Sequence, residues 1–241
     1  MILMPSTNPE EWHYWDSFIR FTKRQLETLD YDPFHPMLWE MQKGMDREGG
    51  LWSSFLYMAF YNIGSSYCAW TSFKPVTKPP VYVDKWAIGV QRRNLRASSV
   101  SKHIGSLVAK AEQHGGIYEY LTHRFSGKQE EDWHRLIEAL EAVWGNGRWG
   151  AYTTAELMQK VNKVPVIPAD LGLDGATGPR RGLSALLGVN TSTRTDVLQS
   201  YGERLLDKLQ GLFPDPKIKW ARNGVDYAMT ESLLCDFYGL T

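Results

Sequence analysis

Two glycines separated by a single residue, Gly145 and Gly147, lie between two stretches that each have the character of a helix. The first stretch covers 130–143, and the second covers 149–161. Glycine tolerates the positive φ angles of a tight turn and lets a ligand approach the backbone closely. The free N–H groups and the positive dipole end of the second helix would suit a phosphate group. The sequence therefore predicts two helices over about 130–162, joined by a very short turn that can bind an anion.

The rest of the chain also has helical patterns. Apolar residues recur every three or four positions, and proline, glycine or a capping side chain marks the ends of most runs. The expected helices cover about 7–29, 37–47 with an end at Gly49–Gly50, 51–67, 98–113, 117–124, 130–143, 149–161, 190–209 and 231–238 with Thr230 as its cap. No stretch has a convincing strand pattern. The expected fold class is all-α, in a single domain over residues 1–241.

The run from 51 to 67 is apolar nearly all round, which predicts a buried helix. It nevertheless contains Tyr57, Tyr61 and Asn62. Buried polar groups need hydrogen-bond partners, which come either from the protein or from a ligand. Two interpretations therefore stay open: these side chains line a substrate pocket, or they satisfy one another at the edge of the core.

Two groups of basic residues are candidate anion sites. Arg92, Arg93 and Arg96 lie within five residues of each other, and the planar guanidinium group binds phosphate oxygens in pairs. Arg180 and Arg181 lie in a glycine-rich stretch that we expect to be a loop able to approach phosphate. The alternatives are a solvated basic turn for the first group and a flexible surface loop for the second.

The charge balance counts mildly against a general nucleic-acid binder, because 27 basic and 27 acidic residues give a formal net charge of zero. A local basic stripe remains compatible with this balance. The two cysteines, Cys68 and Cys235, lie in apolar runs, which predicts free, buried thiols in a reducing compartment. No residue spacing is typical of a metal site, and no segment is long enough to span a membrane. We therefore expect a cytoplasmic protein without a bound metal.

The segment Gly145-Asn146-Gly147-Arg148-Trp149-Gly150-Ala151 resembles the hairpin of helix-hairpin-helix DNA glycosylases. The closest pattern is that of the alkylation-repair branch, which has glycine, any residue, glycine, any residue, tryptophan, threonine and alanine. An essential aspartate follows the hairpin in that family, and Asp170 stands 21 residues after Trp149. Gly150 departs from the pattern, which has threonine at this position. The alternative is an ordinary pair of helices followed by a surface aspartate.

The glycosylase resemblance implies two helical lobes with a cleft between them, into which the target nucleotide is flipped. It implies that Asp170 is the catalytic carboxylate and that Trp149 packs beneath the hairpin. The candidate contacts to DNA phosphate are Gly145, Gly147, Arg148, Arg180 and Arg181.

Several further segments together resemble a bacteriophage family, the amino acid:DNA transferases, also known as α-glutamyl/putrescinyl thymine pyrophosphorylases. These segments are 51–64, 92–96, 147–149, 168–172, 178–183 and 231–237. The resemblance implies a role in thymine hypermodification, in which an amino acid or amine displaces pyrophosphate from 5-(pyrophosphoryloxymethyl)uracil in double-stranded DNA. Arginines would stabilise the growing negative charge of the leaving group, which assigns Arg92, Arg93 and Arg96 to the pyrophosphate.

The residues do not identify the amino acid, and glycine is the working expectation. We expect a monomer without a resident cofactor, and Mg²⁺ bound partly by the pyrophosphate stays open. Two other functions remain: a glycosylase that uses Asp170 to excise a modified base, and a DNA-binding module without catalysis. Release of pyrophosphate, release of a free base, or unchanged DNA would distinguish the three.

Overall fold

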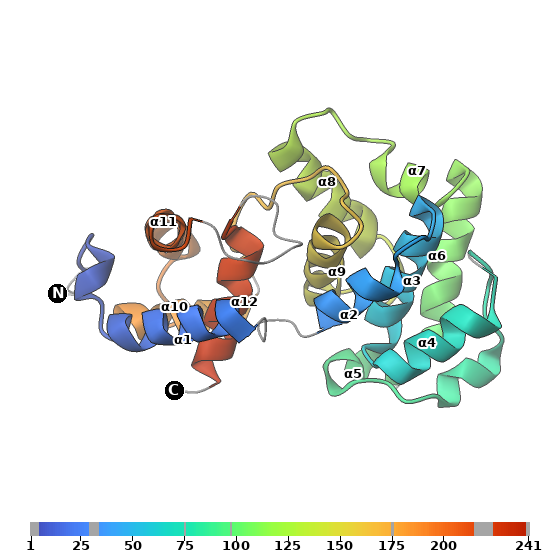
Figure 1. Ribbon diagram of the computed structural model, residues 1–241, viewed down its shortest axis with the longest axis horizontal. Coiled ribbons are helices and arrows are strands. Elements are labelled where there is room, and N and C mark those ends of the chain that lie inside the picture. Colours follow the sequence, from blue (N-terminus) through green and yellow to red (C-terminus); the bar gives the residue numbers. More distant parts are fainter. Residues whose placement is uncertain are drawn as a thin grey trace. The chain divides into compact units, whose positions relative to one another are not determined.

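The computed structural model describes residues 5–28, 34–74, 76–96, 98–174, 176–214 and 224–239, except for the side chains of Arg93 and Asn94. All regular elements in this part of the chain are helices, which confirms the all-α prediction. The chain divides into two compact units, one formed by 1–33 with 168–241 and the other by 34–167 (Figure 1). The expectation of a single domain over 1–241 stays a prediction. Within the described residues, no helix combines the length and the apolar character needed to cross a membrane.

The unit that contains both chain ends is built around two helices that pack very closely. Its elements are η1 (Pro9–Glu11), α1 (Trp15–Thr28), α10 (Gly178–Leu187), α11 (Thr195–Leu212) and α12 (Tyr227–Tyr238). Gly182 of α10 lies against the backbone carbonyl of Leu234 in α12, so that a Cβ atom at this position would overlap the carbonyl oxygen. Aromatic and leucine side chains of α1, α10, α11 and α12 form the core of this unit.

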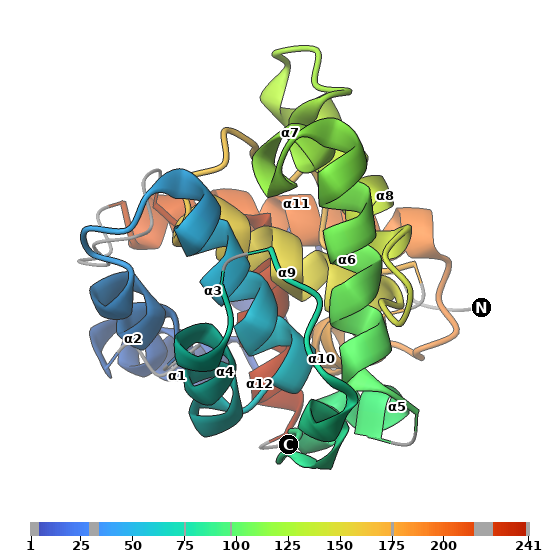
Figure 2. The ribbon, with the colours of Figure 1, turned by 90° about the vertical axis from the view of Figure 1, so that its right-hand side faces the viewer.

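The other unit is organised around one buried helix, α3 (Arg47–Phe60), in which every residue from Gly49 to Phe60 is buried. Helices α4, α6, α7 and α9 pack against α3. Short α5 lies at the start of α6, and α7 follows the end of α6 (Figure 2). The remaining elements of this unit are α2 (Phe34–Met41), α4 (Ile63–Ser72), η2 (Val81–Lys85), η3 (Val90–Arg92), α5 (Arg93–Arg96), α6 (Val100–His114), α7 (Ile117–Thr122), α8 (Gln129–Glu141) and α9 (Arg148–Lys160).

The predicted pair of helices with a short glycine turn is present as α8 and α9, which pack against each other. Gly145 has a φ of 86°, a left-handed conformation that favours glycine. Gly147 precedes the first residue of α9 and has an extended backbone. The prediction was therefore correct both for the turn and, within a residue or two, for the helices beside it.

Other predicted helix boundaries were wrong, because caps overrode the local pattern. Gly49–Gly50 lies inside α3 and does not end a helix, since the Asp46 side chain accepts a hydrogen bond from the Gly49 N–H at 2.7 Å and starts α3 there. The single helix predicted over 51–67 is interrupted at Tyr61, which has a φ of 44°. The Asn62 side chain then caps α4 by accepting from the Ser65 N–H at 3.0 Å.

The ends of the chain show similar differences. The helix expected over 7–29 is divided into η1 and α1. Residues 178–183, expected in a loop, lie in α10, with Pro179 in its first turn, where proline is readily accommodated. Helix α11 begins at Thr195, later than expected, and Asp226 caps α12 in place of Thr230. Cys68 and Cys235 are free, as predicted, but both are exposed and not buried.

Candidate functional site

Arg92 lies against the turn between α8 and α9. Its side chain is only 5% exposed, and its Nη2 donates to the Asn146 Oδ1 at 3.1 Å. The Asn146 amide is oriented by a second hydrogen bond, from its Nδ2 to the Leu140 carbonyl at 3.0 Å. The structure therefore brings together two sites that the sequence predicted separately, the first arginine of the 92–96 cluster and the glycine turn.

The guanidinium group of Arg92 also determines which ring nitrogen of the buried His103 carries the proton. Arg92 Nη2 lies 3.1 Å from His103 Nε2, and an arginine can only donate, so Nε2 is the acceptor. The proton of the neutral imidazole is then on Nδ1, which donates to the Trp144 carbonyl at 2.6 Å. Burial, followed by the charge of Arg92, lowers the pKa of His103 to about 3. Arg92 and His103 thus hold the turn at two points, through Asn146 and through Trp144.

Arg92 keeps one donor without a partner. Among the described residues, no group accepts a hydrogen bond from its buried Nε–H. Burial lowers the pKa of Arg92 to about 10, so the group is still cationic at neutral pH. A buried cation with an unused N–H is costly unless an anion completes its surroundings.

A polar cavity of about 230 Å³ lies at this point. Its lining residues are Gln91, Arg92, Leu95, Gly145, Gly147, Trp149 and Gly150. Helix α9 starts at this cavity, and no side chain caps it at Gly147. The first N–H groups of an α-helix have no carbonyl partner within the helix and give its start a partial positive charge. The cavity thus combines an arginine, an uncapped helix start and an aromatic ring.

Gly150 has no side chain, which leaves room for Arg92 at the start of α9. A Cβ atom at position 150 would overlap the Arg92 Nη1 atom. Position 150 is where the sequence departs from the hairpin pattern of the glycosylases, which has threonine. The absence of a side chain there is what lets the guanidinium lie over the first turn of α9.

Trp149 has a different position from the one predicted. Its ring is 38% exposed and lines the cavity, so the expectation that it packs beneath the turn was wrong. It contacts Tyr61 edge-to-face with ring centroids 5.3 Å apart, and Tyr61 contacts Tyr57 at 5.4 Å. The predicted pocket residues Tyr57 and Tyr61 are therefore connected to the cavity through Trp149. Asn62 has a structural role as the cap of α4.

The other predicted arginines are dispersed. Arg96 is exposed, and the side chain of Arg93 lies outside the described part of the chain. Arg148 lies at the start of α9, with its guanidinium carbon 5.5 Å from the Tyr152 ring centroid. Arg180 donates to the Thr191 carbonyl at 2.8 Å, to the Thr195 hydroxyl at 2.8 Å and to the Thr193 carbonyl, so it fastens the connection between α10 and α11. Arg181 is exposed and lies 5.5 Å from the Tyr238 ring centroid.

Asp170 belongs to the unit with the chain ends, whereas Arg92 and the turn belong to the other unit. The Asp170 carboxylate accepts from the Gly172 N–H at 2.5 Å, in a turn where Gly172 has a φ of 55°. Helix α10 begins only at Gly178, so Asp170 does not directly precede a helix. This hydrogen bond lies within the turn that contains Asp170 itself.

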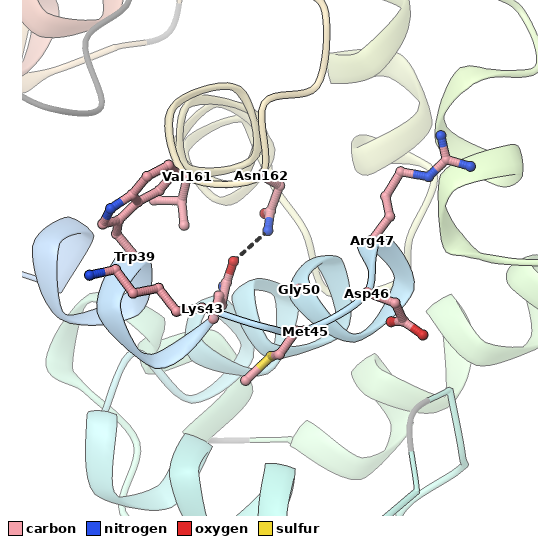
Figure 3. A pocket seen from close by; sticks show the side chains of 9 residues that line it. Trp39, Lys43, Met45, Asp46, Arg47, Gly50, Val161 and Asn162 are labelled. Atoms are coloured by element: carbon pink, nitrogen blue, oxygen red, sulfur yellow. Dashed lines mark hydrogen bonds between the residues drawn. The ribbon is translucent and has the colours of Figure 1, made fainter.

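A second cavity, of about 350 Å³, lies at the other end of α9. A hydrogen bond of 2.7 Å from Asn162 Nδ2 to Gln42 Oε1 crosses it (Figure 3). Trp39 and Val161 lie on one side of this bond, and Asp46 and Arg47 lie on the other (Figure 3). No sequence pattern predicts this cavity, because its residues come from distant segments without a shared motif.

Sequence reasoning also missed the partners of Arg92. His103 is a lone histidine in a helical run, and nothing in its neighbourhood marks it as a partner of the turn. Asn146 had a weak signal, since it stands between the two glycines. The exposure of Trp149 was not foreseen, because a tryptophan in a helical run is usually buried.

Comparison with known families gives one match over nearly the whole chain. The model of a family described as amino acid:DNA transferase matches residues 26–238. No curated protein sequence matches the chain.

Proposed function

Because this chain belongs to the amino acid:DNA transferase family, we propose that it replaces the pyrophosphate of 5-(pyrophosphoryloxymethyl)uracil in DNA with an amino acid. Glycine is the amino acid proposed first, and bacteriophage thymine hypermodification is the proposed setting. The fold proposed is that of the helix-hairpin-helix glycosylases, with α8 and α9 as the hairpin and the target nucleotide flipped for reaction.

The reaction is a substitution at the exocyclic methylene carbon of the base. The amine nitrogen forms a bond to this carbon while the C–O bond to pyrophosphate breaks, and the electron pair of that bond leaves with the pyrophosphate. One proton is lost between the free ammonium of the amino acid and the secondary ammonium of the product. Two functions are therefore needed: stabilisation of a departing anion and removal of a proton.

The observation that carries the proposal is the buried Arg92 at the uncapped start of α9. Its unused Nε–H and its positive charge can stabilise the negative charge that develops on the leaving pyrophosphate. Trp149, half-exposed in the same cavity, offers a flat face to the flipped uracil ring. We assign pyrophosphate to Arg92, the DNA backbone to the turn at Gly145–Gly147, and the proton to Asp170. Any Mg²⁺ in the reaction would arrive on the pyrophosphate.

The cavity at the far end of α9 is not part of the proposed reaction centre. Asn162 follows Gly150 by a helix of more than three turns, which corresponds to about 18 Å at 1.5 Å per residue. A nitrogen held there cannot bond to a carbon whose leaving group lies against Arg92. The attacking amine must therefore bind near Trp149.

The test uses a duplex oligonucleotide with one pyrophosphorylated hydroxymethyluracil and a pool of amino acids. Mass spectrometry of the released nucleosides should reveal an aminoacyl-methyl adduct of uracil, with one pyrophosphate per adduct. Arg92→Met should slow the formation of both products by about 10²–10³-fold, whereas Arg96→Met, in an exposed neighbour, should retain the wild-type rate. Release of free base without pyrophosphate would instead establish a glycosylase, and unchanged DNA with measurable binding would leave only a DNA-binding module.

A further inference from the structure

A separate groove begins at Trp144, the residue before Gly145. It has a volume of about 540 Å³, and Trp144 is 37% exposed. Its lining includes Lys78, Asp84, Lys102, Gly105, Ser106 and Trp144. We propose that this groove binds the phosphodiester backbone of the DNA strand next to the part held at the glycine turn. The inference rests on the proposed function only in that DNA is the substrate.

The groove lining contains two ammonium groups, those of Lys78 and Lys102, and one carboxylate, that of Asp84. Neither Lys78 nor Lys102 forms an ion pair with a described residue, and the Lys102 Nζ lies 4.1 Å from the Trp144 ring centroid. Asp84 is the acidic residue in the lining, and its carboxylate is already engaged. It accepts from the Ser101 N–H at 2.7 Å, the Ser101 hydroxyl at 2.9 Å and the Ser99 hydroxyl at 3.0 Å. The groove therefore offers two ammonium groups to an incoming anion.

The two lysines come from different segments, but Lys102 lies on helix α6 and Lys78 packs against the same helix. Lys78 precedes η2, and its aliphatic chain lies 3.4 Å from the position that a Cβ atom of Gly105 would occupy on α6. Lys102 is on the first turn of the same helix. Two cations along one groove fit a polymer with regularly spaced phosphates, since a single DNA strand has one charge per about 3.4 Å of helix axis.

Trp144 is fixed at the end of the groove nearest the turn. Its backbone N–H donates to the Ser106 hydroxyl at 3.0 Å, and its backbone carbonyl accepts from His103 Nδ1 at 2.6 Å. The backbone of Trp144 is thus held by α6, and its exposed ring lies against the Lys102 ammonium group. An exposed aromatic face in a groove with two cations suits the sugars and bases of a nucleic-acid strand without selecting a sequence.

The experiment measures binding of a fluorescent duplex by anisotropy at several KCl concentrations. Each phosphate contact that is lost should reduce the slope of log K against log salt by about one. Lys78→Ala and Lys102→Ala should each lower the slope by about one, and the double variant by about two. Lys110→Ala is the matched control, because Lys110 is also on α6 but lies 5.5 Å from the Tyr120 ring centroid, outside the groove. Its slope should equal that of the wild type.

The slope also distinguishes this inference from the proposed function. A variant that folds poorly has fewer active molecules, which lowers the signal but leaves the slope unchanged. Unmodified DNA without amino acid is sufficient, so binding does not depend on the transfer reaction. If both lysine variants have the wild-type slope, the groove does not bind the DNA backbone, and the transferase proposal is unaffected. Absence of binding by the wild type would overturn both.

Discussion

The Nη2 of Arg92 lies 3.1 Å from the Nε2 of His103, and in this pair only the histidine can accept. A protonated imidazole would have no lone pair for Arg92 and would place two cations side by side. Burial is the larger cause of the low His103 pKa, and the Arg92 charge adds to it. The stability of the turn therefore depends on a neutral histidine.

This dependence predicts acid sensitivity. The His103 pKa is about 3 in the folded protein, against an ordinary value near 6.5, so the unfolded chain binds the proton first. The stabilising contribution is complete above about pH 6.5 and is lost as the pH falls towards 3. From pH 7 to pH 5, the wild type should lose about 2 kcal/mol of unfolding free energy relative to His103→Gln, at about 1.4 kcal/mol per pH unit. Urea denaturation at both pH values measures this, and parallel curves would contradict it.

Arg92→Met should lower kcat at saturating DNA, and it should change the affinity for DNA much less. Loss of a transition-state contact of this kind costs about 2.7–4 kcal/mol, or about 10²–10³ in kcat. Pyrophosphate should raise the melting temperature of the wild type and of Arg96→Met, but not that of Arg92→Met. A variant that keeps its kcat and loses only affinity would show that Arg92 binds the DNA backbone.

Trp149→Ala should weaken binding of duplexes that contain the modified base. Stacking of a base on an aromatic side chain contributes about 1–3 kcal/mol, so the KM for DNA should rise by about 5- to 150-fold. Trp149→Phe keeps a flat ring and should lose much less. An equal loss of affinity for unmodified duplex would indicate a general backbone contact, and no loss would remove Trp149 from the pocket.

Asp170→Asn removes the charge and keeps the shape of the side chain. An asparagine Oδ1 can still accept from the Gly172 N–H, so the turn and DNA binding should survive. If Asp170 takes the proton from the amine, transfer should fall by about 10²-fold or more. Single-turnover measurements with excess enzyme separate this step from binding. A normal transfer rate would exclude Asp170 as the base.

Local sequence was sufficient to predict the glycine turn and the helices beside it. A turn of so few residues has little conformational choice, and Gly145 takes the positive φ that the glycine pattern implies. The local sequence was not sufficient to predict the helix break at Tyr61, because the apolar run continues there without interruption. The break depends on a distant segment, since the Gly89 N–H donates to the Phe60 carbonyl at 2.8 Å at this point.

The candidate site was predicted in separate pieces and not as an assembly. Arginine at position 92 and glycine at position 145 each suggested an anion site, but no local pattern indicates that they meet. The burial of Arg92 is also invisible in a sequence, because a cluster of arginines is normally solvated. Asp170 remains a prediction from its distance to Trp149.

The bare backbone of Gly150 constrains how this chain can vary. A Cβ atom there would overlap the Arg92 Nη1, so a larger residue at position 150 requires the buried guanidinium group to move or Arg92 to be replaced by a shorter residue. Among relatives of this protein, positions 92 and 150 should therefore change together, and a single change at position 150 should be rare. In a selection for stability alone, Gly150→Ala should be rescued by second-site substitutions at Arg92, and the rescued variants should lack the transfer activity proposed for Arg92.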